Sequence, residues 1–239
     1  MDVKPAYSRV LIKISGEALA GGKGTGLDFD FIEKVCLAVK KCTVMGVQTA
    51  IVVGGGNFWR GVKDGGGKME RSRADHMGML ATVMNALAVA DKMEQLQMPV
   101  KVMTSVPMTT FADVYTRRDA VAELEAGKTV IFGGGTGNPY FSTDTAAALR
   151  AAEIGAGALL LAKNIDGVYS ADPHTDKSAK KYVSVSYGEV LAKHLNVMDM
   201  TATSLAMDNG IPSVVFALSD PENIVRSVMG ENPGTLVTL

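Results

Sequence analysis

The segment covering residues 129–153 constrains the fold more than any other part of the sequence. Residues 129–132 are β-branched or aromatic and suit a buried strand. Four glycines follow within the next five positions, and glycines there permit positive φ angles and leave backbone N–H groups open to a ligand. Ser142, Thr143 and Asp144 are candidate N-caps for the alanine-rich helix that comes next. This order of strand, bare amides and helix N-terminus predicts a bound anion, most naturally phosphate, in an α/β fold; a flexible glycine turn is the alternative.

Two familiar nucleotide-binding signatures are excluded at this segment. No Gly-Lys-Ser/Thr triplet closes the glycine loop, so it is not a Walker loop. Asn138 stands where a dinucleotide fingerprint needs its third glycine, which disfavours a Rossmann dehydrogenase.

A second strand also ends in three glycines. Residues 49–53 form an apolar strand pattern, and residues 54–56 repeat the glycine triplet, with Arg60 close behind. A guanidinium group can bind two phosphate oxygens at once. The repetition predicts a second phosphate-binding loop.

Two further strand patterns run directly into polar loops. Residues 9–12 lead to Lys13, and residues 158–161 lead to a loop that contains Lys163. From its own segment, Lys13 suits either a phosphate at the strand end or a surface lysine with a buried stem. In a parallel sheet covered by helices all four of these loops open at the carboxyl edge, where ligands bind.

The helix pattern over residues 75–97 is apolar on every side in its first half. Such a helix lies either at the centre of a domain or in a subunit contact. Asp75 near its predicted start either favours the helix dipole or points into a site. Residues 235–238 are predicted to form an edge strand.

Composition limits the class of protein. The 239 residues are 47% hydrophobic and 21% charged, which is enough for a sizeable core, and the length suits one α/β domain or two small ones. The net charge of −1 and the absence of basic runs argue against a nucleic-acid polymer as partner. No apolar run approaches the length of a membrane span, and we expect a cytoplasmic protein.

Cysteines and histidines give no catalytic or metal signature. Cys36 and Cys42 lack metal-binding spacing and are expected to be free thiols. His76, His174 and His194 are scattered along the chain. With no nucleophile in evidence, the glycine loops and cations suit positioning and charge stabilisation, as in phosphoryl transfer. The residues alone therefore predict a nucleotide- or phosphate-handling α/β enzyme.

A resemblance extends this prediction. The chain resembles the bacterial uridylate (UMP) kinases of the amino acid kinase family through six motifs in unbroken order, at residues 13–17, 54–60, 75–85, 135–144, 166–173 and 197–199. The resemblance implies a single domain, residues 1–239, with a three-layer α/β/α sandwich around a mainly parallel sheet. It implies that roughly residues 1–150 form the UMP side and the oligomer contact, and residues 151–239 the ATP side.

The implied reaction is ATP + UMP giving ADP + UDP, a step of pyrimidine nucleotide biosynthesis. Mg²⁺ would accompany ATP, held mainly by phosphates with no direct protein ligand. The family resemblance also implies a homohexamer, with GTP activation and UTP inhibition that vary among members. The segment linked to GTP in some of them corresponds to Gly21, Gly22, Lys23, Gly24, Thr25 and Gly26.

The resemblance assigns residues to each substrate. Catalytic roles fall on Lys13, Asp144 and Arg60, with Asp144 orienting Lys13. ATP would be bound by Lys13, Ile14, Ser15, Gly16, Gly56, Arg60, Lys163, Asn164, Tyr169 and Asp172. One common form of the family has Thr at the position of Lys163, so the choice between Lys163 and Asn164 stays open. UMP would be bound by Gly55, Asp75, Thr136, Gly137, Asn138, Pro139, Tyr140, Phe141, Ser142 and Thr143.

Two alternatives remain at this stage. One is a family member that phosphorylates a carboxylate or carbamate. The other is a non-catalytic relative that binds oxyanions, like the molybdenum storage proteins.

Overall fold

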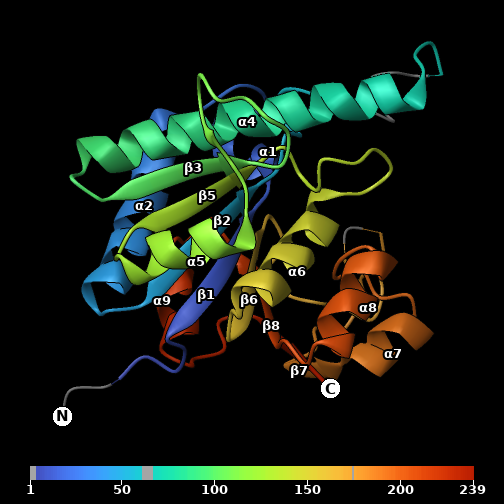
Figure 1. The fold of residues 1–239 in the computed structure, drawn as a ribbon. Coiled ribbons are helices and arrows are strands. Elements are labelled where there is room, and N and C mark those ends of the chain that lie inside the picture. Colours follow the sequence, from blue (N-terminus) through green and yellow to red (C-terminus); the bar gives the residue numbers. More distant parts are fainter. Residues whose placement is uncertain (1–3, 61–66, 174) are drawn as a thin grey trace.

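The computed structural model describes residues 4–60, 67–173 and 175–239. Within these ranges a nine-stranded sheet lies between two layers of helices (Figure 1). The strands are β1 Arg9–Ile14, β2 Gln48–Val53, β3 Val100–Thr104, β4 Asp113–Val114, β5 Thr129–Gly133, β6 Ala158–Lys163, β7 Ser184–Ser186, β8 Ser213–Ala217 and β9 Thr235–Thr238. The three-layer α/β/α fold predicted from the sequence is confirmed.

The helices alternate with the strands along most of the chain. They are α1 Gly16–Leu19, the 3₁₀ turn η1 Gly21–Lys23, α2 Phe29–Val44, α4 Arg71–Gln95, α5 Arg117–Glu125, α6 Thr143–Ile154, α7 Tyr187–Ala192, α8 Met200–Asp208 and α9 Glu222–Val228.

The sheet brings the four predicted loop-bearing strands together. Its order is β4-β3-β5-β2-β1-β6-β8-β9-β7, and every neighbouring pair is parallel except β8 and β9. The predicted strands are β5, β2, β1 and β6, which are consecutive neighbours at the centre. Their carboxyl ends, including both glycine triplets, therefore share one edge of the sheet.

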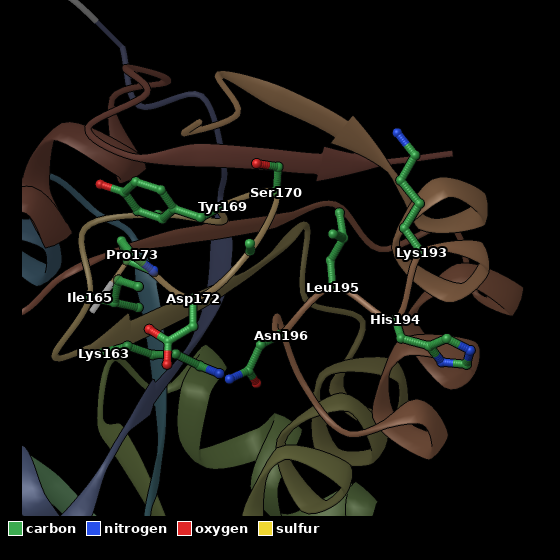
Figure 2. A pocket seen from close by; sticks show the side chains of 12 residues that line it. Lys163, Ile165, Tyr169, Ser170, Asp172, Pro173, Lys193, His194, Leu195 and Asn196 are labelled. Atoms are coloured by element: carbon green, nitrogen blue, oxygen red, sulfur yellow. The ribbon is translucent and has the colours of Figure 1, made fainter. Parts of the chain in front are cut away.

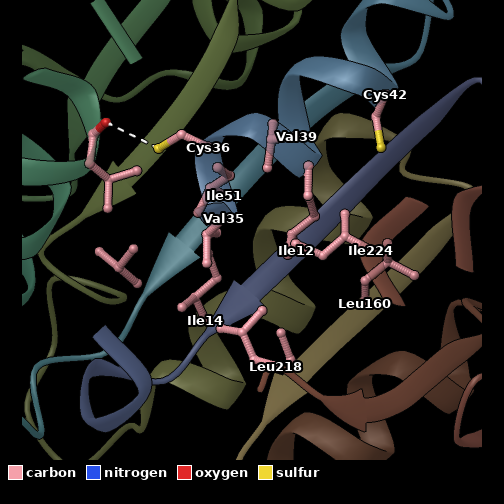
Figure 3. Packing of buried hydrophobic residues seen from close by; sticks show 14 of the residues in the cluster. Ile12, Ile14, Val35, Cys36, Val39, Cys42, Ile51, Leu160, Leu218 and Ile224 are labelled. Carbon is pink, nitrogen blue, oxygen red and sulfur yellow. Dashed lines mark hydrogen bonds between the residues drawn. The ribbon is translucent and has the colours of Figure 1, made fainter. Parts of the chain in front are cut away.

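Side-chain alternation along the strands builds two cores. Val10, Ile12 and Ile14 of β1 face the layer that contains α2, α4 and α9. Figure 3 shows Ile12 and Ile14 packed beneath α2 with Leu160 and Ile224. Leu11, on the opposite face, packs toward α5, α6 and α8. This period of two residues is the strand geometry expected of a sheet covered on both faces.

Both cysteines lie in the first of these cores. Cys36 and Cys42 are free and buried on α2, and the Cys36 thiol contacts the Val89 carbonyl oxygen at 3.9 Å (Figure 3). Burial raises the pKa of each thiol to about 12. Both side chains therefore act as small apolar core residues.

Short polar residues cap the N-termini of several helices. Asp28 accepts a hydrogen bond from the Phe31 N–H at 3.1 Å and caps α2. Asp199 caps α8 through the Ala202 N–H at 2.8 Å. Among the three candidates at α6, Ser142 is the N-cap.

Two predicted boundaries are wrong. Helix α4 begins at Arg71 rather than at Asp75, because the Glu70 carboxylate accepts hydrogen bonds from the Ser72 and Arg73 N–H groups and caps the helix earlier. Strand β9 is not an edge strand, since β7 pairs beyond it.

Candidate active site

A buried cluster of two lysines and one aspartate lies at the carboxyl edge of the sheet. Lys13 is the fifth residue of β1 and projects to the same face as Leu11, toward α6. Its ammonium lies 2.7 Å from Oδ1 of Asp144, in the first turn of α6. Lys163, the last residue of β6, lies 3.8 Å from the other carboxylate oxygen. One carboxylate thus faces two ammonium groups.

The surroundings of this cluster perturb its protonation. Burial works to raise the pKa of the Asp144 carboxyl, but the positive charges of Lys13 and Lys163 outweigh it and hold that pKa below the usual value. Burial lowers the pKa of the Lys163 amine, and the attraction of Asp144 opposes that shift. The Lys163 amine also donates a hydrogen bond to the Val197 carbonyl oxygen. Side chains with shifted pKa values are common in functional sites, so this cluster is a candidate for the active site.

The start of α6 holds Asp144 in place. The Ser142 hydroxyl accepts hydrogen bonds from the N–H groups of Asp144, at 3.0 Å, and Thr145. The Asp199 carboxylate in turn accepts hydrogen bonds from the hydroxyls of Ser142 and Thr145. Because Asp199 also caps α8, the two helix starts are joined at the cluster.

The first glycine triplet lies against the turn that follows Lys13. A Cβ atom added to Gly16 would lie 2.7 Å from the Gly56 backbone nitrogen, so only glycine allows this approach. Arg60 pairs with Glu17 of α1 at 2.5 Å on the rim of the same edge. Both side chains are about 42% exposed, so the pair adds little stability and can open toward an anion.

A cavity of about 150 Å³ opens beside this triplet. We call it the Asp75 cavity; it is lined by Gly55, Trp59, Ala74, Asp75, Gly78, Met79, Thr82, Gly135, Thr136, Phe141 and Thr143. Five of these residues are predicted UMP ligands. Asp75 accepts hydrogen bonds from the Tyr140 N–H and from Arg71, each at 2.8 Å.

A second cavity, of about 240 Å³, lies on the other side of Lys163. We call it the Tyr169 cavity; its walls come from residues 163–173 and 193–196. In Figure 2 the ends of Lys163 and Asn196 point toward each other, with Asp172 nearby. Lys163, Tyr169 and Asp172, three predicted ATP ligands, line this cavity, whereas Asn164 is exposed and outside it.

Other predicted residues lie near the two cavities without lining them. They belong to the connection between β5 and α6, whose Thr136 and Phe141 line the Asp75 cavity: Gly137, Asn138, Pro139, Tyr140 and Ser142. The predicted effector segment, Gly21 to Gly26, includes η1 and contacts Asn57 through the Gly26 N–H, at 3.1 Å from the Asn57 carbonyl oxygen.

The sequence prediction missed several lining residues. Thr82 is a polar residue within an apolar stretch of the predicted helix, and this contrast in the sequence could have identified it as a site residue. Trp59 also lines the Asp75 cavity and was not among the predicted ligands. Lys193, His194, Leu195 and Asn196 follow α7 in a segment with no motif, and only the fold brings them to the Tyr169 cavity.

Comparison with known proteins assigns the family. The model of the amino acid kinase family matches residues 8–217 of the sequence. The chain belongs to the amino acid kinase family.

Several solved structures of UMP kinases, also called uridylate kinases, superpose on nearly the whole of this chain. The chain is similar to UMP kinase from Bacillus anthracis, with a TM-score of 0.93, 38% identity and coverage of 97% of this chain and 96% of the other. It is similar to UMP kinase from Ureaplasma parvum, with a TM-score of 0.91, 34% identity and coverage of 97% and 99%. Uridylate kinase from Archaeoglobus fulgidus matches at a TM-score of 0.76, 28% identity and coverage of 96% and 99%.

Among the described residues, no group of three or more His, Cys, Asp or Glu side chains is arranged to hold a metal ion. Across the same part of the chain, no helix combines the length and apolar character needed to cross a membrane.

Proposed function

We propose that this amino acid kinase transfers the γ-phosphoryl group of ATP to UMP, giving ADP and UDP. The main support for this proposal is the ion pair between Lys13 and Asp144, which lies between the two cavities. Thr143, next to Asp144, lines the Asp75 cavity, and Lys163, the other partner of Asp144, lines the Tyr169 cavity. The similarity to UMP kinases over nearly the whole chain supports UMP as the acceptor.

The acceptor needs no general base. It is a phosphate oxygen whose second pKa is about 6, so it is largely deprotonated at pH 7. The barrier arises from bringing two anionic groups into line, and the protein lowers it by positioning and by offsetting their repulsion.

Lys13 supplies the positive charge at the transferred group. The glycine triplets at 54–56 and 133–135 lie at the same edge of the sheet. The N–H groups of Gly54 and Gly134 are bonded to the Ile14 carbonyl oxygen and the Thr82 hydroxyl, so backbone donors to phosphate would come from the other glycines of the two triplets. Asp144 holds the ammonium groups of Lys13 and Lys163 on either side of its carboxylate, so that neither must reorganise during transfer.

Magnesium fits this arrangement as a companion of ATP. Both oxygens of the Asp144 carboxylate face ammonium groups, which leaves phosphate oxygens as the natural ligands. When bound, the ion would neutralise charge on the β- and γ-phosphates.

The substrate roles follow the two cavities. We assign ATP to the Tyr169 cavity and to the turns at 13–16 and 56–60, and prefer Lys163 over the exposed Asn164 as its ligand. We assign UMP to the Asp75 cavity, with the ribose hydroxyls on Asp75 and the base beside residues 136–143. In this proposal the UMP side lies within residues 1–150 of a single domain, and the ATP side combines the turns at 13–16 and 56–60 with residues from the 151–239 part.

We further propose a cytoplasmic homohexamer. Leu80 and Met84 of α4 are about half exposed, and an outward apolar face suits a subunit contact. GTP activation and UTP inhibition belong to the same proposal, with residues 21–26 as the candidate GTP segment.

A substrate panel tests the function. ADP release from Mg-ATP is measured with UMP, CMP, dUMP, N-acetylglutamate, aspartate and carbamate, each with and without GTP or UTP. We expect turnover with UMP and none with the carboxylates or carbamate. Turnover with a carboxylate and not with UMP would assign the chain to another branch of the family. No ADP release with any of these acceptors would indicate a non-catalytic oxyanion-binding relative.

A further inference from the structure

Helix α4 contacts both glycine triplets at close range. A Cβ atom added to Gly55 would lie 2.8 Å from the Gly78 carbonyl oxygen and 2.9 Å from the Ala81 Cβ. One added to Gly133 would lie 3.3 Å from the Val83 Cα. Figure 1 shows α4 lying along the strands β3 and β5. The two phosphate-side loops therefore rest on one rigid element.

Thr82 joins α4 to the second triplet. Its side chain is buried, and its hydroxyl accepts a hydrogen bond from the Gly134 N–H at 2.8 Å while it donates one to the Met79 carbonyl oxygen at 2.6 Å. Gly134 has a φ of +78°, so its backbone is open to many conformations unless a neighbour restrains it.

Asn85 joins the same helix to the first triplet, one turn further along. It is fully buried and donates a hydrogen bond to the Gly54 carbonyl oxygen at 2.6 Å. Its amide also pairs reciprocally with the buried amide of Asn57, at 2.7 and 3.0 Å. The second N–H of Asn57 reaches the Gly26 carbonyl oxygen at 2.7 Å. Every amide proton of the pair is used, so the connection is rigid.

We propose that Thr82 and Asn85 are positioning residues that set the separation of the two glycine loops and hence of the donor and acceptor phosphates. This proposal rests on the proposed function for its kinetic consequences. Glycine loops carry no side chains that could pack them in place, so their geometry must come from the elements that support them. Residues three apart lie on one face of a helix, which gives the two anchors a constant spacing.

A purely structural role is the alternative, in which these polar groups only satisfy buried neighbours. Such a role predicts lower stability with unchanged substrate affinity and loop protection. The positioning role predicts a change confined to the anchored loop and to the substrate that it contacts.

Thr82→Val and Thr82→Ser form the matched test. Valine keeps the shape and removes the hydroxyl, whereas serine keeps the hydroxyl. In the ligand-free protein we expect Thr82→Val to speed hydrogen exchange of a peptide covering residues 133–140, and to raise the Kd for UMP by about tenfold in calorimetry. In Thr82→Ser, the exchange rate of residues 133–140 and the Kd for UMP should both stay within about twofold of wild type.

Asn85→Leu tests the first anchor. It removes the amide with little change in volume, and we expect kcat with UMP to fall by about 10²-fold, because a misplacement on the order of 1 Å between reacting groups has an effect of that size.

Three results separate the claims. Unchanged exchange of residues 133–140 in Thr82→Val, or equal impairment by Val and Ser, would overturn the anchoring. A kcat for Asn85→Leu within about twofold of wild type would overturn the role of Asn85. Exchange that rises as expected in a protein that does not phosphorylate UMP would uphold the anchoring and remove the proposed function.

Discussion

At the scale of single residues, the decisive arrangement is the placement of Lys13 against Asp144. Strand β1 is buried on both faces, yet its fifth residue is a lysine with only 7% of its surface exposed. A buried ammonium without a partner would be costly, and the carboxylate 2.7 Å away removes that cost. Lysine at the end of this strand is thus explained by the charge that it meets there.

Replacing Lys13 with alanine tests its assigned role. We expect kcat with UMP to fall by roughly 10²–10³-fold or more, as when one electrostatic stabiliser is lost. Steady-state ADP release measures the effect, and circular dichroism checks that the fold is intact. Nearly unchanged turnover in a folded Lys13→Ala protein would show that the lysine does not act on the transferred group.

Asp75→Asn separates ribose binding from chemistry. An asparagine oxygen can still accept the hydrogen bond from the Tyr140 N–H, so the loop geometry should survive. The charge that receives the ribose hydroxyls is lost, and we expect KM for UMP to rise more than kcat falls. Initial rates across UMP concentrations measure both constants; a fall in kcat at constant KM speaks against ribose recognition.

The lowered pKa of Asp144 gives a pH dependence with a definite sign. A carboxyl whose folded-state pKa lies below its usual 3.8 contributes stability that is present above pH 3.8 and lost as the pH falls through the folded-state value. Urea unfolding of wild type and Asp144→Asn between pH 5 and the acid limit of folding measures the difference. We expect the difference in the free energy of unfolding between wild type and Asp144→Asn to become smaller toward acid pH. A difference that stays constant with pH would refute a lowered pKa of Asp144.

Residue roles were only partly predictable from the sequence. Lys13 is visible because it stands at a strand end, and Asp144 because it stands at a helix start. Asp75 was noticed beside a predicted helix start, although α4 begins four residues earlier, at Arg71. Thr82 and Asn85 were missed, because their partners, Gly134, Gly54 and Asn57, are remote in sequence and only the packing of α4 brings them into contact.

At the scale of elements, strand and helix positions followed from local chemistry. Apolar runs predicted β1, β2, β5 and β6, and the candidate caps at residues 142–144 predicted the start of α6. Helix α4 was predicted to start late, since Glu70 is an uncommon cap. Strands β4 and β7, of two and three residues, are too short to show alternation, and the second explains why β9 is not an edge strand.

Gly55→Ala tests the close approach between α4 and the first triplet. The added Cβ would lie 2.8 Å from the Gly78 carbonyl oxygen, so either the helix or the loop must move. We expect a large loss of kcat/KM for UMP and a lower melting temperature. Gly188→Ala in α7 is the matched control, because its Cβ would meet only the Ser186 hydroxyl, at 3.8 Å.

We expect the Gly188→Ala control to stay active and stable. Alanine in a helix is favoured over glycine by roughly 0.5–1 kcal/mol, so Gly188→Ala should leave turnover unchanged and stability equal or higher. Normal turnover in Gly55→Ala, measured beside this control, would show that the contact is not required for activity.

At the scale of the whole molecule, topology explains why the loops proposed to bind ATP and UMP meet at one edge of the sheet. The central strands β5, β2, β1 and β6 are parallel and adjacent, so their carboxyl ends deliver both glycine triplets, Lys13 and Lys163 to one edge. This convergence was predicted from the strand pattern. The walls of the Tyr169 cavity at 193–196 were not, because they depend on how α7 and α8 return to the sheet.

A bisubstrate ligand tests the central claim, that two nucleotides meet end to end beside Lys13. The probe joins adenosine to uridine through a chain of phosphates long enough to span both cavities. We predict inhibition competitive with both ATP and UMP, and an affinity for the probe that drops sharply in Lys13→Ala. Competition with only one of the substrates, or equal affinity in wild type and Lys13→Ala, would contradict the claim.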